Sequence, residues 1–280
     1  MSTFNSPPKR ICAIHDLSGL GRCSLTVIIP VLAHLGIQVC PIPTALLSTH
    51  TGGYTGFTFL DLTDEIKKIA CHWKELECSF DAVYTGFLGS AKQIELVLDL
   101  CAYYKKKHGS FILADPVMGD NGVKYATYTD EMCALTSHLI KDADIITPNL
   151  TEACMLANVP YRDNFSKAEL SDLLCCLGGL GAKRVVITGI KDKHTIGCVY
   201  LDKALNVQGE VYSPYIDIFY PGAGDIFASV LLGKMLNGVS FDQACKSCVD
   251  FIYEAVRFTK SLKTPQREGL AIEPLGHLLR

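Results

Sequence analysis

Short runs of β-branched and apolar residues alternate along this chain with longer segments of helical periodicity. Apolar strands that alternate with helices indicate a mostly parallel sheet covered by helices on both faces, so we predict an α/β fold of three layers, α/β/α. The expected strands are 10–15, 37–43, 81–86, 110–116, 143–149 and 183–189, with 198–202 and 206–213 as an antiparallel pair. The expected helices are 24–35, 61–73, 91–107, 166–180, 223–237 and 241–259. No linker rich in Gly, Ser or Pro interrupts this order, so we expect one domain over residues 1–280.

Composition excludes several classes of protein. The chain has 49% hydrophobic and 20% charged residues and a net charge of -3, without a basic cluster that would predict a nucleic-acid partner. Its apolar stretches are broken well before the roughly 18 residues that a membrane span requires. Residues 1–10 show no export signal, and thirteen cysteines are an odd number, so we expect reduced thiols and a cytoplasmic protein.

Polar and glycine residues gather where the predicted strands stop. In open parallel sheets, ligands bind beyond the carboxyl ends of the strands. The strand-end residues are His15-Asp16, Thr85-Gly86, Asp115-Pro116, Thr147-Pro148-Asn149 and Thr188-Gly189. We therefore expect the functional site at this edge.

Two common nucleotide-binding motifs are excluded. The segment GLGRCS (19–24) follows the first strand, but it lacks a third glycine, and the next acidic residue after it is Asp61, too far to hold a ribose. No phosphate-binding P-loop motif occurs in the chain. GLGRCS remains either a turn that lets a small substrate approach the backbone or a plain tight turn.

The segment GAGD (222–225) opens the predicted helix 223–237. Glycines at a helix start leave backbone N–H groups uncovered, and the helix dipole favours an anion there. Such a site stabilises a phosphoryl group in flight, and an aspartate in the first turn can accept the proton of an attacking hydroxyl. The simpler interpretation is a glycine turn with an aspartate as an N-terminal charge.

Three further segments each allow two interpretations. In TPNLTE (147–152), Asn149 and Glu152 form either a capping box or a magnesium site. DPVMGD (115–120) is either a turn or a metal-phosphate site, because it places two carboxylates at a strand end. STHTGGYTG (48–56) is either a loop that grips a small polar ring or an ordinary surface loop.

As a set and in this order, these segments resemble the ribokinase-like superfamily, and within it the vitamin B6 (pyridoxal) kinases. The resemblance runs from about Ile11 to Phe258. DPVMGD, ADIITPN and the S-x-H-T loop resemble B6 kinases in particular, whereas G-x-G-D is shared across the superfamily. The resemblance implies a ribokinase-like fold, ATP-dependent phosphorylation of the 5′-hydroxymethyl group of a pyridine ring, and usually a homodimer. It also implies magnesium and often a monovalent cation such as K+.

The resemblance also assigns roles to residues. It implies Asp225 as the catalytic base and Gly222, Ala223 and Gly224 as the anion hole. Residues that it places at the ATP phosphates and magnesium are Asp115, Asp120, Asn149, Glu152 and Thr188, with Glu152 and Asp115 next to the metal. Residues that it places around the ring are Asp16, Ser18, His50, Thr51, Tyr54 and Phe87.

The sequence departs from the pyridoxal kinase pattern at three points. Ala223 replaces the usual threonine, which leaves a site built from backbone groups intact. Asp16 stands where these kinases carry serine, and HDLSGLG (15–21) resembles the hydroxymethylpyrimidine (phosphate) kinases instead. The segment after Asp120 is short, which suggests a reduced flap over ATP. The alternatives are therefore a hydroxymethylpyrimidine kinase, a sugar kinase, or a non-catalytic nucleotide-binding protein, and the presence of Asp225 argues against the last.

Overall fold

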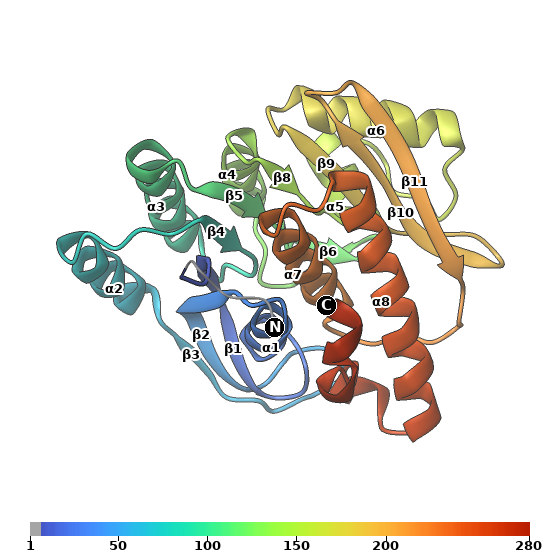
Figure 1. Cartoon of the computed structure of the whole chain (residues 1–280), viewed down its shortest axis with the longest axis horizontal. Coiled ribbons are helices and arrows are strands. Elements are labelled where there is room, and N and C mark those ends of the chain that lie inside the picture. Colours follow the sequence, from blue (N-terminus) through green and yellow to red (C-terminus); the bar gives the residue numbers. More distant parts are fainter. Residues whose placement is uncertain (1–6) are drawn as a thin grey trace.

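The computed structural model describes residues 7–280, in which nine strands form one sheet in the order β11-β10-β9-β8-β5-β4-β1-β2-β3 (Figure 1). The pairings from β9 through β8, β5, β4 and β1 to β2 are parallel, and β3, β10 and β11 pair antiparallel at the two ends. The strands are β1 (Arg10–Leu20), β2 (Gln38–Thr49), β3 (Phe59–Asp61), β4 (Ala82–Thr85), β5 (Phe111–Ala114), β8 (Ile145–Ile146), β9 (Arg184–Lys191), β10 (Thr195–Asp202) and β11 (Val207–Pro214). A separate small hairpin consists of β6 (Gly119–Asp120) and β7 (Val123–Lys124).

Helices cover both faces of the sheet. One face packs against α1 (Leu25–His34), α7 (Ala223–Leu236), α8 (Phe241–Leu262) and the C-terminal turn η2 (Glu273–Leu279). The other face packs against α2 (Thr63–Glu75), α3 (Ala91–His108), α4 (Asp130–Lys141), α5 (Leu150–Ala157) and α6 (Lys167–Gly179). The predicted three-layer α/β/α fold with a mostly parallel sheet is confirmed.

Alternation along the strands produces the two cores. On β1, Ile11 and Ala13 enter the core beneath α7, while Cys12 and Ile14 enter the core beneath α3. Both sets are fully buried, because successive side chains of a strand point to opposite faces. Helix α7 is buried on all sides over residues 226–233, and it lies beside α8 in Figure 1. This central position brings the N-terminus of α7 to the carboxyl edge of the sheet.

Three predicted strands end at least two residues later than expected: β1, β9, and β2, which runs to Thr49 instead of residue 43. Strand β1 continues past His15 to Leu20, because it stays paired with β2 after its pairing with β4 has ended at Ile14. Strand β9 runs on to Lys191 through an irregularity next to Thr188, where Gly189 takes a φ of 71°. The predicted strand end at His15-Asp16 is therefore the end of the β1–β4 pairing and not of the strand itself.

Several elements were not predicted. The edge strand β3, the β6–β7 hairpin and helix α4 fall in segments for which we expected no element. The hairpin turn carries Asn121 and Gly122 at φ values of 49° and 76°, the residues that such a turn favours. The short segment after Asp120 therefore forms a defined β-hairpin.

Two expectations concern location. None of the helices within residues 7–280 combines the length and the apolar character that crossing a membrane needs. All thirteen cysteines are free thiols. The prediction that residues 1–10 carry no export signal falls largely on residues 1–6, which lie outside the described residues.

Candidate active site

The strand register places the predicted site residues next to one another. Ile14, Thr85, Ala114 and Ile146 stand side by side across β1, β4, β5 and β8. The residues that follow them therefore share the carboxyl edge of the sheet: His15 and Asp16, Gly86, Asp115 and Thr147. Thr147 donates its hydroxyl to Asp115 Oδ1 at 2.9 Å, which joins two neighbouring strand ends.

The N-terminus of α7 opens onto this edge. Gly222 is its N-cap in the left-handed conformation, with a φ of 81°, and a Cβ there would lie 2.0 Å from the carbonyl oxygen of Arg22. Only glycine fits both constraints. A Cβ on Gly224 would meet nothing within 4 Å, so the space next to this residue is open. Ile226 donates its N–H to the Gly222 carbonyl, and the N–H groups of residues 223–225 precede that first helical bond.

Asp225 lies in the first turn of α7 and is half-buried. Its pKa is raised to about 7, mainly by burial and in smaller part by the charges of Asp115 and Asp16. The backbone N–H of Ser24 opposes this rise by donating to Asp225 Oδ2 at 2.8 Å. A carboxyl group with a pKa near neutrality is suited to accept a proton from a hydroxyl.

Asp16 is buried and held by two hydroxyl groups. Ser18 donates to Asp16 Oδ2 at 2.7 Å, and Ser24 donates to Asp16 Oδ1 at 2.6 Å. Ser24 therefore contacts both Asp16 and Asp225. In the structure, Ser24 thus connects the predicted ring-binding pair, Asp16 and Ser18, to the predicted base, Asp225.

Asp115 and Glu152 are the two further carboxylates of the predicted site, and the charge of Asp115 acts on both Asp225 and Glu152. Burial raises the pKa of Asp115 to about 7, although the bond from Thr147 counteracts this. Burial and then the charge of Asp115 raise the pKa of Glu152 well above its ordinary value. Ion pairs among residues 7–280 involve other carboxylates, so Asp16, Asp115, Glu152 and Asp225 form a group without a Lys or Arg partner there.

Asn149 and Glu152 form a complete capping box at the start of α5. Asn149 Oδ1 accepts the N–H of Glu152 at 3.0 Å, and Glu152 Oε2 accepts the N–H of Asn149 at 2.9 Å. Glu152 Oε1 also accepts the N–H of Met118 at 3.1 Å, and Asn149 Nδ2 donates to the carbonyl of Gly119. The cap is present, and it ties α5 to the loop after β5. It leaves open whether Glu152 also orders magnesium.

The remaining predicted phosphate residues flank this loop. Asp120 is half-buried at the base of the β6–β7 hairpin and accepts the N–H of Asn121 at 2.8 Å. Burial raises the pKa of Asp120, while the Asn121 bond and the charge of Lys191 lower it. Thr188 is half-buried, pairs with Asn149 through an isolated bridge, and donates its N–H to Pro148.

The predicted ring-binding loop meets the site from β2. His50 is buried; its Nε2 lies 2.7 Å from the Arg267 carbonyl, and its Nδ1 accepts the N–H of Gly52, which indicates the neutral tautomer with the proton on Nε2. The ring of His50 packs edge-to-face on Tyr54. The guanidinium of Arg267 lies over the ring of Tyr54, 5.0 Å from its centroid. Both ring nitrogens of His50 are thus engaged with backbone groups.

Two predicted ring-binding residues are less closely tied to the carboxylates. Thr51 is exposed, and its hydroxyl forms no hydrogen bond with a residue in the range 7–280. Phe87 is half-buried after β4, and its carbonyl accepts the Thr44 hydroxyl at 3.0 Å.

The cluster of four carboxylates could supply some, but not all, of the ligands of a magnesium ion. Among residues 7–280, no three metal-ligating side chains come close enough to form a complete protein site. Magnesium usually keeps several waters and takes one or two carboxylates plus substrate phosphates, so a complete protein site is not required. Buried carboxylates with raised pKa values and no cationic partner suit that role.

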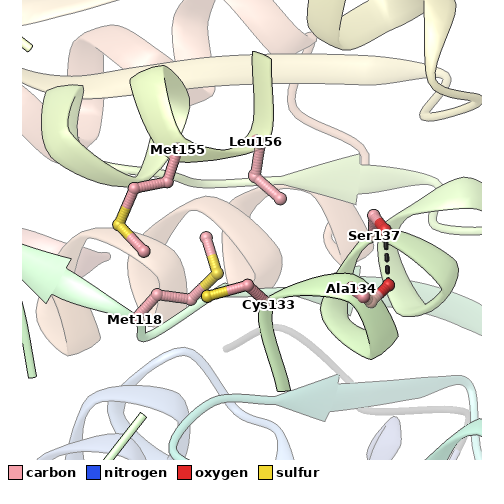
Figure 2. A pocket seen from close by; sticks show the side chains of 6 residues that line it. All are labelled: Met118, Cys133, Ala134, Ser137, Met155 and Leu156. Carbon is pink, nitrogen blue, oxygen red and sulfur yellow. Dashed lines mark hydrogen bonds between the residues drawn. The ribbon is translucent and has the colours of Figure 1, made fainter. Parts of the chain in front are cut away.

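A cavity of about 210 Å³ lies apart from this group, between α4 and α5. Figure 2 shows Met118, Cys133 and Met155 directing their sulfur atoms into it, with Leu156 beside them. None of the predicted site residues lines this cavity. Met118 links the cavity to the site through its bond to Glu152.

The sequence analysis assigned no individual role to three contributors. Ser24 and Arg22 lie in GLGRCS (19–24), which was expected only as a turn before the helix that starts at Ser24. Tyr125, just after the hairpin, is close enough to Glu152, Asp120, Asp115 and Asp225 that burial and their charges raise its pKa. Arg22 joins the site loop to the C-terminal segment by an ion pair of 2.7 Å with Glu273. The sequence does not reveal the roles of these residues, because each acts through contacts between distant segments.

Comparisons with known proteins agree with this arrangement. The chain is 44% identical to a Bacteroides thetaiotaomicron protein provisionally described as a phosphomethylpyrimidine kinase, with a TM-score of 0.95 over 99% of this chain and 96% of that chain. A second crystal form of it was solved with pyridoxal. A pyridoxal kinase from Lactobacillus plantarum is 29% identical, with a TM-score of 0.88 over 97% and 96%. A pyridoxal kinase from Dictyostelium discoideum is 27% identical over 83% of this chain and 80% of its own length.

A family model described as phosphomethylpyrimidine kinase matches residues 29–270, which is most of the chain. The predictions of a kinase and of a ribokinase-like fold similar to pyridoxal kinases are confirmed by these relatives. The chain belongs to the phosphomethylpyrimidine kinase family, within the ribokinase-like superfamily.

Proposed function

We propose that this kinase transfers the γ-phosphoryl group of ATP to the 5′-hydroxymethyl group of pyridoxal, pyridoxamine or pyridoxine. The observation that carries the proposal is the glycine-built N-terminus of α7, with Asp225 in its first turn, linked through Ser24 to the buried Asp16. Support also comes from the Bacteroides relative that was solved with pyridoxal and from the pyridoxal kinases among the relatives. They favour a B6 vitamer over hydroxymethylpyrimidine as the substrate.

Each residue has a defined task in this proposal. Asp225 accepts the proton of the attacking hydroxyl, and the backbone N–H groups of residues 222–224 stabilise the charge on the transferring phosphoryl group. Asp16 and Ser18 bind the ring of the substrate. The ring also contacts the loop with His50, Thr51 and Tyr54, and it contacts Phe87 after β4. Asp115, Asp120, Asn149 and Thr188 face the phosphates. This residue assignment rests on the family resemblance and on the clustering described above.

Magnesium belongs to the same proposal. Glu152 and Asp115 would hold it, directly or through water, and the ion would neutralise charge between the β- and γ-phosphates. A monovalent cation such as K+ would assist. We include in this proposal a single kinase domain over residues 1–280, a homodimer and a cytoplasmic location.

An assay panel tests the proposal. Turnover of ATP is measured with pyridoxal, pyridoxamine, pyridoxine and hydroxymethylpyrimidine, each with and without magnesium. We expect the B6 vitamers to be phosphorylated with a much higher kcat/KM than hydroxymethylpyrimidine. Preference for the pyrimidine would assign the chain to the alternative substrate, and absence of turnover with all four would contradict the proposed function.

A further inference from the structure

Ser24 has a backbone conformation that is unusual for any residue other than glycine. Its φ is 51° and its ψ is -132°, and its side chain is buried. A non-glycine residue at positive φ stores strain, and such residues persist only where the surrounding structure imposes them. They occur preferentially at functional sites.

The side chain of Ser24 does not do what its position suggests. Ser24 is the N-cap of α1, where a serine usually accepts an N–H from the first turn of its own helix. Here it makes no such bond. Its hydroxyl donates to Asp16 Oδ1 at 2.6 Å instead, and its backbone N–H donates to Asp225 Oδ2 at 2.8 Å. One residue thus binds both carboxylates, from β1 and from α7.

The chain on both sides of Ser24 is firmly held. Its carbonyl accepts the N–H groups of Val27 and Ile28, which start α1. Before it, Arg22 donates its N–H to Glu268 at 3.1 Å and pairs with Glu273, and its carbonyl lies against Gly222. These contacts can maintain the strained conformation and keep the Ser24 N–H directed at Asp225.

We propose that Ser24 is a positioning residue of this kinase, which orients the Asp225 carboxylate with its backbone N–H and is itself fixed by its hydroxyl bond to Asp16. The inference rests on the proposed role of Asp225 as the base. The bond to Oδ2 leaves Oδ1 of Asp225 to accept the proton. Because the same residue holds Asp16, the ring-binding carboxylate and the base are linked through a single short path.

The bond from Ser24 also lowers the pKa of Asp225, and with it the pH at which Asp225 becomes a base. Ionisable groups near Asp225 come from each element around it: Asp16 and Tyr84 from β1 and β4, Asp115 after β5, Tyr125 after β7, and Cys23 before α1. None of these is a cation, so the Ser24 N–H is the contact that favours the ionised form of Asp225. Loss of this contact would shift the acidic limb of the pH–rate profile to higher pH.

Three variants test the proposal. Ser24→Ala loses the hydroxyl bond to Asp16, and alanine is as unfavourable as serine in this backbone conformation. The backbone should therefore relax to another conformation, and the N–H should turn away from Asp225. Ser24→Gly loses the same hydroxyl, but glycine adopts this conformation without strain, so the N–H should stay in place. Ser18→Ala is the matched control, because it removes the other hydroxyl bond to Asp16 and has no contact with Asp225.

We expect Ser24→Ala to lower kcat about 10- to 100-fold, the usual effect of a misplacement near 1 Å. It should also shift the acidic limb of the pH–rate profile to higher pH. Ser24→Gly should keep kcat within about threefold of the wild type and raise KM for the ring substrate, since its backbone suits glycine. Ser18→Ala should raise that KM without moving the limb. A Ser24→Ala variant with wild-type kcat and pH profile would overturn the proposal, as would equal losses of kcat in the Ala and Gly variants.

A second measurement does not depend on the substrate. Titration of ¹³C-labelled aspartate carboxyl groups by NMR should give a higher pKa for Asp225 in Ser24→Ala than in the wild type or in Ser24→Gly. An unchanged pKa would overturn the proposal. If the wild type phosphorylates only hydroxymethylpyrimidine, the proposed B6 function fails while the same comparison of variants still decides the role of Ser24.

Discussion

At the scale of single residues, the site depends on buried carboxylates that lack cationic partners. An aspartate in the first turn of a helix ordinarily has a lowered pKa, as Asp242 at the start of α8 does through the Ser240 hydroxyl. Asp225 also lies in the first turn of its helix, yet burial and two neighbouring aspartates raise its pKa to about 7. The contrast between these aspartates identifies the one suited to proton transfer.

The first prediction concerns Asp225 directly. Asp225→Asn should lower kcat about 10²- to 10⁴-fold, the usual contribution of a positioned base, while ATP still binds. Steady-state kinetics and calorimetric ATP titration check this. Asp242→Asn is the control, because Asp242 is also in the first turn of a helix but is exposed. Near-normal turnover in Asp225→Asn would remove this residue from the mechanism.

The second prediction concerns the choice of ring. A carboxylate beside a ring nitrogen favours the protonated ring, because an opposite charge stabilises the cation. Asp16→Asn keeps the shape and removes the charge, so it should weaken binding of the protonated ring about 10- to 100-fold, the range of a charged hydrogen bond. It should also flatten the pH dependence of kcat/KM. Superimposable profiles for both proteins on pyridoxal and hydroxymethylpyrimidine would mean that Asp16 only shapes the chain.

At the scale of elements, the site is assembled from strand ends and helix starts. The capping box of α5 fixes Asn149 and Glu152, and the Met118 bond extends that order to the loop that follows β5. Glu152 therefore has a structural role that is independent of any metal. The two roles predict different effects of substitution, so they can be separated.

The third prediction separates them. Glu152→Gln places an amide NH₂ group against backbone N–H groups, which should destabilise the fold by about 1–3 kcal/mol. If Glu152 also orders magnesium, the magnesium concentration for half-maximal rate should rise as well. Glu169→Gln is the control, because Glu169 completes the other capping box, at the start of α6, and is not one of the predicted site residues. Lowered Tm with an unchanged magnesium requirement in Glu152→Gln would leave only the cap.

Most of the strands and helices, and the place of the site at the edge of the sheet, could be predicted from the sequence. Apolar runs predicted most strands and helices, and the strand-end rule predicted that Asp16, Asp115 and Asn149 would share one edge. The β6–β7 hairpin had a local signal in Asn121-Gly122, which we did not use. For Ser24 the GLGRCS segment indicated only a turn: its role depends on a strained φ and on two carboxylates, eight and 201 residues away in the sequence. Local periodicity carries no information on such contacts.

At the scale of the whole molecule, the uncompensated carboxylates should cost stability. Asp115 has a pKa of about 7 in the folded chain, above the ordinary value of 3.8. Between these values the folded state retains a proton that the unfolded state has released, so stability falls as pH rises through this window. Buried His15 acts in the opposite direction, because burial lowers its pKa to about 3, and stability gains from it as pH rises toward 6.5.

The last prediction isolates the contribution of Asp115. Asp115→Asn should have the Tm of the wild type near pH 4 and exceed it by about 3–6 °C at pH 8, because the variant carries no buried charge to repel Glu152 and Asp225. His15 is common to both proteins, so its contribution cancels in the difference. Asp144→Asn is the matched control: Asp144 is equally buried, but Lys183 lies 2.7 Å from it, so this substitution should lower Tm at pH 8.

Magnesium with ATP should raise the Tm of the wild type more than that of Asp115→Asn, because the ion compensates the charge that the variant lacks. Differential scanning calorimetry from pH 4 to 8 measures these differences, and a Tm of Asp115→Asn below that of the wild type at pH 8 would show that this carboxylate stabilises the fold.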